Sequence, residues 1–469
     1  MQYSDMPNEQ EAAVSFSPDH SGSDSPSCTS FSEKDHSLTV GPDGPVLLQD
    51  TILHETLETF VNEKIIERAV HTKGYGAFGY FTAYRSMSQF TKASFLQAPG
   101  QQTYTFSRFS LAVSNRGTPD TSRNVRGFST KFYTDEGNFD LLTNHIPVFL
   151  VRDAMQFPSA IKSLSPSPLN NLPDPEAFWK FAAAHPEATH FITWLYSDLG
   201  TIDSLRHIRT YGVNTYTWVN EAGEKHYVKY HLLPMAGERS ITREEAIKLA
   251  GENPDIAGED LYRTLAQGIP VEYELHVQLM EPSEAADLPF DPLDDTKVWD
   301  EEAYPLIQVG LLTLDANVDD YQNQVEKAAF SPANLIDGIE LSNDKMLQGR
   351  SFIYWDAQRR RIGPDFRTVP VNYEENWSPK TEITTGLGEK ADGIIQRSEI
   401  PDQDNFIQAG EHYLSLDQTQ RDHLAENLAA DLSLVTDERI LTCVLSYLYA
   451  ANNELGYSVA QRLNRNQDI

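Results

Sequence analysis

Apolar and polar residues alternate along much of the chain, and this period of two is typical of β-strands with one buried face. We expect strands over residues 65–72, 76–84, 103–113, 127–134, 139–144, 212–219, 225–233, 271–280 and 306–314. Short turns link several of these neighbours, among them residues 135–138, which read Asp-Glu-Gly-Asn. A set of mostly consecutive strands closes most economically into an antiparallel barrel, because closure removes the exposed edges.

Helical spacing replaces the alternation in other parts of the chain. We expect helical insertions at residues 173–198, 241–251 and 258–267. Near the start, Leu53, Leu57 and Phe60 share one side of a short helix, and from residue 402 onwards Leu424, Leu428 and Leu432 recur at every fourth position. The pattern therefore predicts an α+β fold with five parts: a disordered polar tail (1–38), an N-terminal arm (39–64), an eight-stranded antiparallel β-barrel with helical insertions (65–320), a connecting segment (321–401) and a C-terminal helical domain (402–469).

One predicted helix, over residues 342–364, carries an unusual face. Ser342 or Asn343 is expected to cap its start, and Gly363 followed by Pro364 to end it. Spacings of four, four and seven place four side chains together: Met346, Arg350, Tyr354 and Arg361. An arginine in hydrogen-bond reach of a tyrosine oxygen stabilises the phenolate, which is a ligand for ferric haem. The alternative is an amphipathic surface helix on which the tyrosine only packs.

Composition narrows the classes of partner. The 69 acidic residues outnumber the 37 basic ones and give a formal net charge of -32, which argues against nucleic acid or an anionic membrane as a partner. Only two cysteines occur, no run approaches the ~18 apolar residues of a membrane span, and the last residues are not a peroxisomal signal. We therefore expect a cytoplasmic enzyme with a small substrate.

Polar side chains occupy strand positions where a purely structural barrel prefers apolar ones. His71 and Arg68 belong to the first predicted strand, Arg108 and Ser110 to the third, and Asn144 ends the fifth. Each has a structural interpretation by itself, because a lone strand histidine is often a satisfied core residue and Asn144 fits a turn. Their combination with an arginine–tyrosine helix instead suggests one chemical site.

Four stretches carry a family resemblance: ERAVHTKGYGAFGYF, FSRFSLAV, TSRNVRGFSTKFYTDEGNFDLLTNHIPVFLVRDAMQFP and DKMLQGRSFIYWDAQRRRIGPDFRTVPVN. In sequence, order and spacing they strongly resemble the haem catalases, over about residues 41–463. The resemblance implies an eight-stranded antiparallel barrel with an arm, a wrapping segment over residues 321–401 and C-terminal helices, in a homotetramer. It also implies a b-type haem and the dismutation of hydrogen peroxide through a ferryl intermediate.

The resemblance assigns roles to the polar residues. His71 would be the distal base, Ser110 its hydrogen-bond partner and Asn144 its neighbour over the iron, while Tyr354 would be the proximal ligand and Arg350 its charge partner. The other haem contacts would be the propionate partners Arg68, Arg108 and Arg361, the distal-pocket residues Val70, Phe149 and Phe157, and Met346.

Two positions depart from the family near the approach to the haem. Ala112 and Asn124 stand where a valine and an aspartate are common, so we expect lower affinity for hydrogen peroxide and easier entry of bulkier hydroperoxides. In the segments that hold NADPH in some members, His190, Ser197, Val298 and Trp299 are present, but Leu199 and Leu233 replace basic residues and Glu301 replaces a histidine. Since phosphate needs cations, we expect no retained NADPH.

Two alternatives stay open on these residues. Within the same fold, a catalase-like peroxidase or an enzyme of organic hydroperoxides would use the same haem. A barrel that binds an apolar ligand without haem belongs to another class, since fold does not fix function. That second alternative leaves His71, Arg350 and Tyr354 without a purpose, and a haem absorption spectrum separates it from the others.

Overall fold

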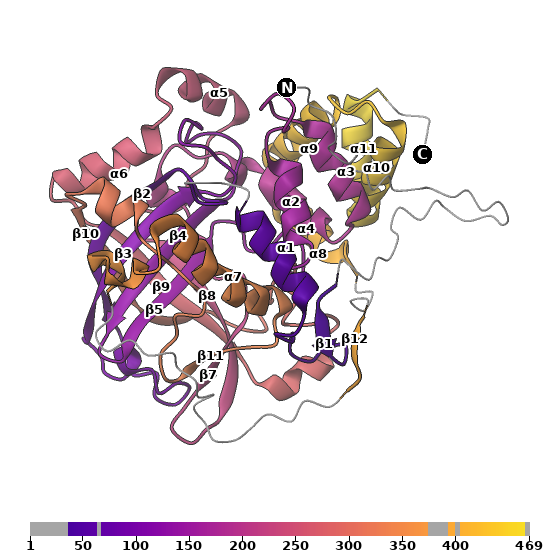
Figure 1. Ribbon diagram of the computed structural model, residues 1–469. Helices are drawn as coiled ribbons and strands as arrows, with labels where there is room; N and C mark the ends of the chain where they lie inside the picture. Colours follow the sequence, from indigo (N-terminus) through magenta and orange to yellow (C-terminus); the bar gives the residue numbers. More distant parts are fainter. Residues whose placement is uncertain (1–35, 63–66, 374–392, 399–403, 465–469) are drawn as a thin grey trace, which may run out of the picture.

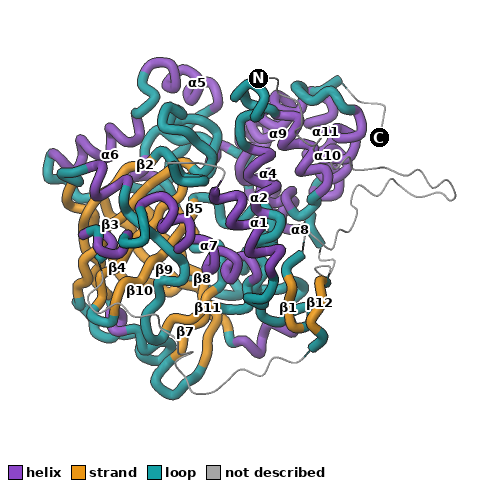
Figure 2. The backbone as a smooth tube through the Cα atoms, in the orientation of Figure 1, coloured by secondary structure: helices purple, strands orange, loops and turns teal. Residues whose placement is uncertain are grey.

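The computed structural model describes residues 36–62, 67–373, 393–398 and 404–464. Its centre is a closed, antiparallel, eight-stranded barrel in which the last strand pairs with the first (Figures 1 and 2). In order around the barrel the strands are β2 (Gly74–Ala83), β3 (Gln102–Leu111), β4 (Arg126–Thr134), β5 (Gly137–Asn144), β6 (Thr210–Tyr211), β8 (Lys225–Pro234), β9 (Val271–Met280) and β10 (Ile307–Asn317). The predicted barrel is therefore confirmed.

Aromatic residues from alternate strand positions fill the barrel core. Phe109 of β3 lies opposite Phe128 of β4 in the strand register, and their rings stack with centroids 4.1 Å apart. Phe81 of β2 and Phe132 of β4 also meet inside, at 5.6 Å. All four side chains are almost fully buried. This regular packing explains why strict alternation located β3 and β4 correctly.

The first predicted strand is wrong. Residues 67–73 form no strand, β2 begins only at Gly74, and residues 63–66 lie outside the described part of the chain. His71 has a φ of 62°, which interrupts any extended conformation. The alternation of residues 65–72 was therefore a coincidence of side-chain types. Two short strands of the barrel sheet, β6 and β11 (Ile339–Leu341), were not predicted, since they are too short to alternate. β7 (Tyr216–Val219) is the end of the strand expected at residues 212–219.

Most helices gather on one side of the barrel, and α6 lies on the other side in the view of Figure 1. The expected insertion at residues 173–198 consists of two helices, α3 and α4, which pack against the C-terminal helices. Helices α5 and α6 match the other two expected insertions. Helix α2 was not predicted. The helices are α2 (Phe157–Leu164), α3 (Pro175–Ala184), α4 (Ala188–Tyr196), α5 (Arg243–Glu252), α6 (Ile256–Ala266), α8 (Ile407–Ser415), α9 (Gln418–Leu432), α10 (Glu438–Ala451) and α11 (Asn453–Arg462). No helix in the described ranges is long and apolar enough to cross a membrane.

The N-terminal arm begins earlier than predicted. His36 and Ser37 are buried, Ser37 donates to Asp153, and Leu38 opens strand β1 (Leu38–Val40). The end of the predicted tail, residues 36–38, thus belongs to the fold, because it has buried partners; residues 1–35 lie outside the described residues. β1 pairs with β12 (Ile395–Arg397), a strand within the segment expected to be an irregular connection.

The arm continues into α1 (Thr51–Asn62), which packs on α7 (Lys345–Ile362), the helix that carries Tyr354. Asp344, and not Ser342 or Asn343, caps α7: its carboxylate accepts from the backbone N–H of Leu347 at 2.9 Å. Gly363 ends the helix as predicted, with a φ of 121° that favours glycine. The cap and the packing fix α7 against the barrel.

Candidate functional site

Two cavities, of about 130 and 290 Å³, meet between α7 and the barrel. They share several lining residues, including His71, Asn144 and Tyr354. All the predicted site residues line one or both cavities, although they come from distant parts of the sequence: Arg68, Val70, His71, Arg108, Ser110, Asn144, Phe149, Phe157, Met346, Arg350, Tyr354 and Arg361.

Backbone contacts hold His71 in its left-handed conformation. Its N–H donates to the carbonyl oxygen of Ala112 at 2.7 Å, and its own carbonyl oxygen accepts from Nη1 of Arg108 at 3.0 Å. The imidazole Nδ1 lies 2.9 Å from Oγ of Ser110 in a hydrogen bond. Gly127, the register partner of Ser110, leaves room for the ring, because a Cβ there would lie 2.8 Å from Cε1 of His71. The imidazole is therefore fixed before any substrate arrives.

The imidazole is neutral. Burial is the main cause that lowers the pKa of His71 to about 3, and the positive charges of Arg108, Arg350 and Arg68 lower it further. With Nδ1 in the hydrogen bond to Ser110, Nε2 is the nitrogen left to accept a proton. The ring is thus poised to take up a proton and to release it again.

Across the cavity, Tyr354 is tied to a chain of buried polar groups. Arg350 donates to the Tyr354 oxygen from Nη2 at 3.0 Å and from Nε at 3.3 Å, and from Nη1 to Oδ1 of Asn214 at 2.5 Å. Asn214 in turn donates to Asp344 at 2.9 Å. Burial opposes the charge on Arg350, but its interactions with Tyr354, Tyr216 and Asp344 together outweigh burial and raise the arginine pKa. Two N–H groups of one cationic side chain are therefore directed at the Tyr354 oxygen.

Three arginines converge at the edge of the 130 Å³ cavity. Arg68 and Arg361 donate to the same carbonyl oxygens, of Glu326 and Ala328, and Arg68 also lies 3.7 Å from the Glu326 carboxylate. Burial and mutual repulsion lower the pKa of Arg361 to about 9 and that of Arg68 as well. Nη1 of Arg68 and Nε of Arg108 are buried without a hydrogen-bond partner among the described residues. Such a cluster fits a ligand with carboxylate groups.

The remaining walls are apolar. Phe149 and Phe157 stack with ring centroids 5.9 Å apart, and Val70, Met346 and Ile353 complete the lining. The donor set therefore combines a tyrosine oxygen with a cationic partner, an opposing imidazole, apolar walls and unsatisfied guanidinium groups. These groups fit an iron porphyrin, whose iron takes a phenolate and whose propionates pair with arginine.

Asn144 and Asn124 differ in how they are held. Asn144 ends β5, opposite Gly127 and Tyr211 in the strand register, and lines both cavities. Asn124 is clasped to the backbone of Val113: its Oδ1 accepts from the N–H at 3.2 Å and its Nδ2 donates to the carbonyl oxygen at 2.6 Å. A carboxylate cannot make the second of these bonds, so the neutral amide suits this position.

Other groups of the site were not found from the sequence. Asn214, Asp344, Glu326 and Gly127 hold the catalytic candidates in place, yet only the three-dimensional structure brings them there. The one available signal was the amide side chain of Asn214 within the strand expected at residues 212–219. It is compatible with an ordinary turn and did not identify a partner for Arg350.

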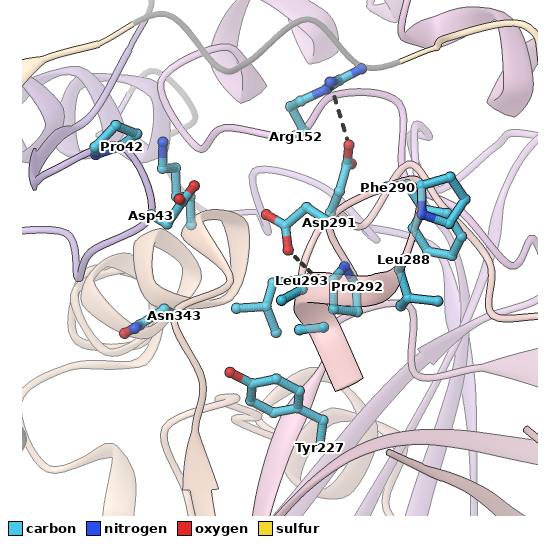
Figure 3. A pocket seen from close by; sticks show the side chains of 15 residues that line it. Pro42, Asp43, Arg152, Tyr227, Leu288, Phe290, Asp291, Pro292, Leu293 and Asn343 are labelled. Carbon is cyan, nitrogen blue, oxygen red and sulfur yellow. Dashed lines mark hydrogen bonds and ion pairs between the residues drawn. The ribbon is translucent and has the colours of Figure 1, made fainter. Parts of the chain in front are cut away.

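A separate cavity of about 500 Å³ lies between the arm and the loop that follows β9 (Figure 3). Arg152 and Asp294 form an ion pair there at 3.4 Å, and Asp291 accepts from the N–H of Leu293. Among the described residues, this cavity shares no lining residue with the two that contain His71 and Tyr354. It is larger than either, but it lacks their chemistry.

A neutral imidazole and a tyrosine oxygen that accepts from an arginine line the same cavities, an arrangement suited to an oxidoreductase that cleaves peroxides. A family model described as Catalase matches residues 25–408, and one described as Catalase-related immune-responsive matches residues 399–463. Catalase-1 of Arabidopsis thaliana and catalase isozyme 2 of Solanum tuberosum are each 40% identical to the chain, over 91% of it and 93% of the relative.

Solved structures agree with these relatives. Catalase A from Saccharomyces cerevisiae has a TM-score of 0.79 and 32% identity, over 90% of this chain and 94% of that one. A bacterial catalase has a TM-score of 0.80 and 32% identity, over 97% and 98%. The chain therefore belongs to the catalase family, whose activity is the conversion of hydrogen peroxide to water and dioxygen.

Proposed function

We propose that this catalase works with a haem held between α7 and the barrel, with Tyr354 as the iron ligand and Arg350 as its charge partner. The observation that carries the proposal is the chain of hydrogen bonds from Tyr354 through Arg350 and Asn214 to Asp344, opposite the imidazole of His71. When bound, the haem supplies the redox-active iron at which the O–O bond of the peroxide breaks. A b-type haem is the proposed form.

The distal residues of the proposed site move one proton. Hydrogen peroxide must lose a proton from one oxygen and gain one on the other for heterolysis, and Nε2 of neutral His71 carries this proton between them. Ser110 keeps the ring in place through Nδ1. Asn144 donates a hydrogen bond that holds the peroxide in line, a contribution typically of ~10²-fold or more.

The edge and the walls hold the cofactor. Arg68, Arg108 and Arg361 pair with the two propionates, which supply acceptors for the unsatisfied Nη1 of Arg68 and Nε of Arg108. Val70, Phe149, Phe157 and Met346 contact the apolar faces of the ring. The two propionates would thus neutralise the positive charges of three neighbouring arginines that otherwise repel one another.

The test of the cofactor assignment is the Tyr354→Phe variant, produced with ample haem. We expect the wild-type protein to show a high-spin ferric tyrosinate spectrum and to release dioxygen from hydrogen peroxide. The variant should lose the spectrum, since phenylalanine offers no ligand, and should retain little haem. An identical spectrum in wild type and variant would refute Tyr354 as the ligand.

A second candidate function is the metabolism of organic hydroperoxides by the same haem. Ala112 and Asn124 line the 290 Å³ cavity, and neither adds bulk or negative charge there. Dioxygen release with hydrogen peroxide alone, compared with the consumption of tert-butyl hydroperoxide, separates the two activities.

We also propose that the protein retains no NADPH. A cavity of about 580 Å³ is lined by Val298 and Trp299, but there Glu301 forms an ion pair with Arg209 at 2.5 Å. The carboxylate of Glu301 pairs with the guanidinium of Arg209, so this cation is not free to bind a phosphate, and the negative charge of Glu301 repels one. The dinucleotide should be absent from protein purified without added cofactor, as measured by chromatography of the released small molecules.

The proposed assembly is a homotetramer in the cytoplasm that binds neither nucleic acid nor membrane. Apolar side chains on and near the arm support self-association, because Leu48, Ile52, Ile394 and Ile395 are all exposed in the single chain. The net charge of -32 supports the absence of anionic partners. Sedimentation at several protein concentrations tests the assembly, and a single-chain mass would contradict it.

A further inference from the structure

The cavity that contains His71 adjoins an outer cavity of about 440 Å³. The two share four lining residues, Ser122, Arg123, Leu164 and Leu195. The outer cavity is bounded by residues of α3, α4, α5 and α9, so it lies between the helical layer and the barrel insertions. A ligand in the outer cavity would therefore be next to the approach to the catalytic histidine.

Two arginines line the outer cavity. Nη1 of Arg123 donates to the carbonyl oxygens of Leu195 at 2.7 Å and Ser197 at 2.6 Å, whereas its Nη2 is buried with no hydrogen-bond partner among the described residues. Arg243 is exposed at the start of α5. Burial first, and then the charge of Arg243, lower the pKa of Arg123 to about 10. Two guanidinium groups therefore line one cavity, and the charge of Arg243 acts on Arg123.

The two carboxylates of the outer cavity have other functions. Asp174 caps α3 and accepts from the N–H of Ala177 at 3.2 Å. Asp431 accepts from Nε1 of Trp179 at 3.1 Å and from the hydroxyl of Tyr196. Asp431 and Asp198 reduce the positive field at Arg123, but neither forms an ion pair with it among the described groups.

The inner cavity has no carboxylate among its described lining residues. Asn124 contributes a neutral amide that is already paired with the backbone of Val113. The apolar part of its lining includes Val113, Val125, Ile161 and Leu164. A molecule that passes inward from the arginines thus meets apolar surface and then His71, without electrostatic repulsion of a negative charge.

We propose that Arg123 and Arg243 bind the carboxylate of an organic hydroperoxide, so that this enzyme reduces hydroperoxides of carboxylic acids in addition to dismutating hydrogen peroxide. The apolar body of the substrate lies along Val125 and Leu164, and its hydroperoxide group reaches His71. The inference rests on the haem site proposed above. In this proposal the outer cavity is the part of the enzyme that distinguishes negatively charged from neutral hydroperoxides.

The reaction is balanced by hydrogen peroxide as the reductant. One R–OOH and one H₂O₂ give one R–OH, one H₂O and one O₂. The O–O bond of the organic hydroperoxide breaks and takes up two electrons, while hydrogen peroxide gives up two electrons and both protons and leaves as dioxygen. Each molecule of alcohol formed is therefore accompanied by one molecule of dioxygen.

The test compares two substrates that differ only in charge, 4-hydroperoxy-4-methylpentanoate and its methyl ester, each with hydrogen peroxide and the holoenzyme. Alcohol is measured by chromatography and dioxygen by electrode. We expect kcat/KM to be about tenfold higher for the acid, because a charge-assisted contact forms only with the carboxylate. In Arg243→Gln this preference should fall about fivefold, through KM, with dismutation of hydrogen peroxide unchanged.

Lys248→Gln is the matched control. Lys248 is exposed on the same helix, pairs with Glu252 at 3.9 Å and does not line the cavity. Equal turnover of acid and ester, or an equal effect of Lys248→Gln and Arg243→Gln, would overturn the proposal. Failure of the wild-type protein to dismutate hydrogen peroxide would instead refute the haem site, so the two failures are distinguishable.

Discussion

The two faces of the site hold their key side chains in opposite ways. His71 is fixed mainly by backbone groups and by the neutral hydroxyl of Ser110, and no carboxylate of the described residues forms a hydrogen bond or ion pair with its ring. Tyr354 is fixed by a charged chain that passes through Arg350 and Asn214 to Asp344. The difference follows the proposed chemistry: a group that exchanges a proton needs a neutral setting, whereas a group that stays anionic needs a permanent countercharge.

The largest effect is expected from a substitution on the His71 face of the site. The substitution His71→Ala removes the proton carrier and should lower kcat for hydrogen peroxide by about 10³-fold or more. The haem spectrum should persist, because the Tyr354 face is untouched. Steady-state dioxygen release and the absorption spectrum measure both outcomes. A variant that lost the haem as well would show that the two faces do not act separately.

A smaller effect is expected on the opposite face from Asn214→Leu. This change removes the acceptor for Nη1 of Arg350 and one of the donors to Asp344, so Arg350 should move from the Tyr354 oxygen. We expect a shift of the ferric tyrosinate band, a lower reduction potential, because a phenolate with less countercharge donates more strongly to ferric iron, and about a tenfold loss of kcat. Asn214→Asp keeps the acceptor for Arg350 but loses the donor to Asp344, so it separates the effects of the two bonds. An unchanged spectrum and potential in Asn214→Leu would argue against a role for this chain.

Gly127→Ala tests how closely His71 is fitted. The added methyl group would lie 2.8 Å from Cε1 and 2.9 Å from Nδ1 of the ring, so the imidazole must move and the bond to Ser110 must lengthen. We expect a severalfold loss of kcat with normal haem content. Gly251→Ala serves as the control, because a Cβ there meets nothing within 4 Å. Equal activity of both variants would show that the ring position is not restrictive.

The mildest test is acidification. Burial lowers the pKa of His71, His145, His231 and His412 to about 3, and that of His190 to about 4, from an ordinary 6.5. Between pH 6.5 and these values the unfolded chain binds more protons than the folded one, so the free energy of unfolding should fall as the pH falls.

Urea unfolding at pH 7, 6, 5 and 4 measures this dependence. The variant His412→Gln should reduce the slope by about one proton, since it removes one group whose charging opposes folding. His423 supplies an internal contrast, because the hydrogen bond to Asp198 raises its pKa. A midpoint that did not vary between pH 6.5 and 4 would contradict the neutral state of these buried rings.

The sequence predicted the barrel because its strands bury one face regularly, as Phe109 and Phe128 do. It failed at residues 65–72, where the site and not the barrel decides the conformation: Arg68, Ala69, Val70 and His71 all line the same cavity, which an alternating strand does not allow. The start of α7 was ambiguous for another reason. Ser342, Asn343 and Asp344 are all good caps, and only the position of Leu347 N–H selects the last.

The chemical residues were predictable as a set, but their supports were not. Arg350 and Tyr354 lie one turn apart on a helix, so their contact follows from spacing. Asn214 reaches Arg350 only because the fold brings the segment before β7 next to α7. Glu326 likewise approaches Arg68 only in the folded chain. Contacts between residues distant in sequence leave no local pattern.

The pairing of β1 with β12 has a consequence for the order of assembly. β1 (Leu38–Val40) pairs with β12 (Ile395–Arg397), and Arg397 forms an ion pair with Asp50 at 2.7 Å. Most of the chain lies between the two strands in sequence. During synthesis β1 cannot pair with β12 until residue 397 has left the ribosome. Because a loop of this length closes slowly, we expect the pairing of β1 with β12 to form after the barrel has folded.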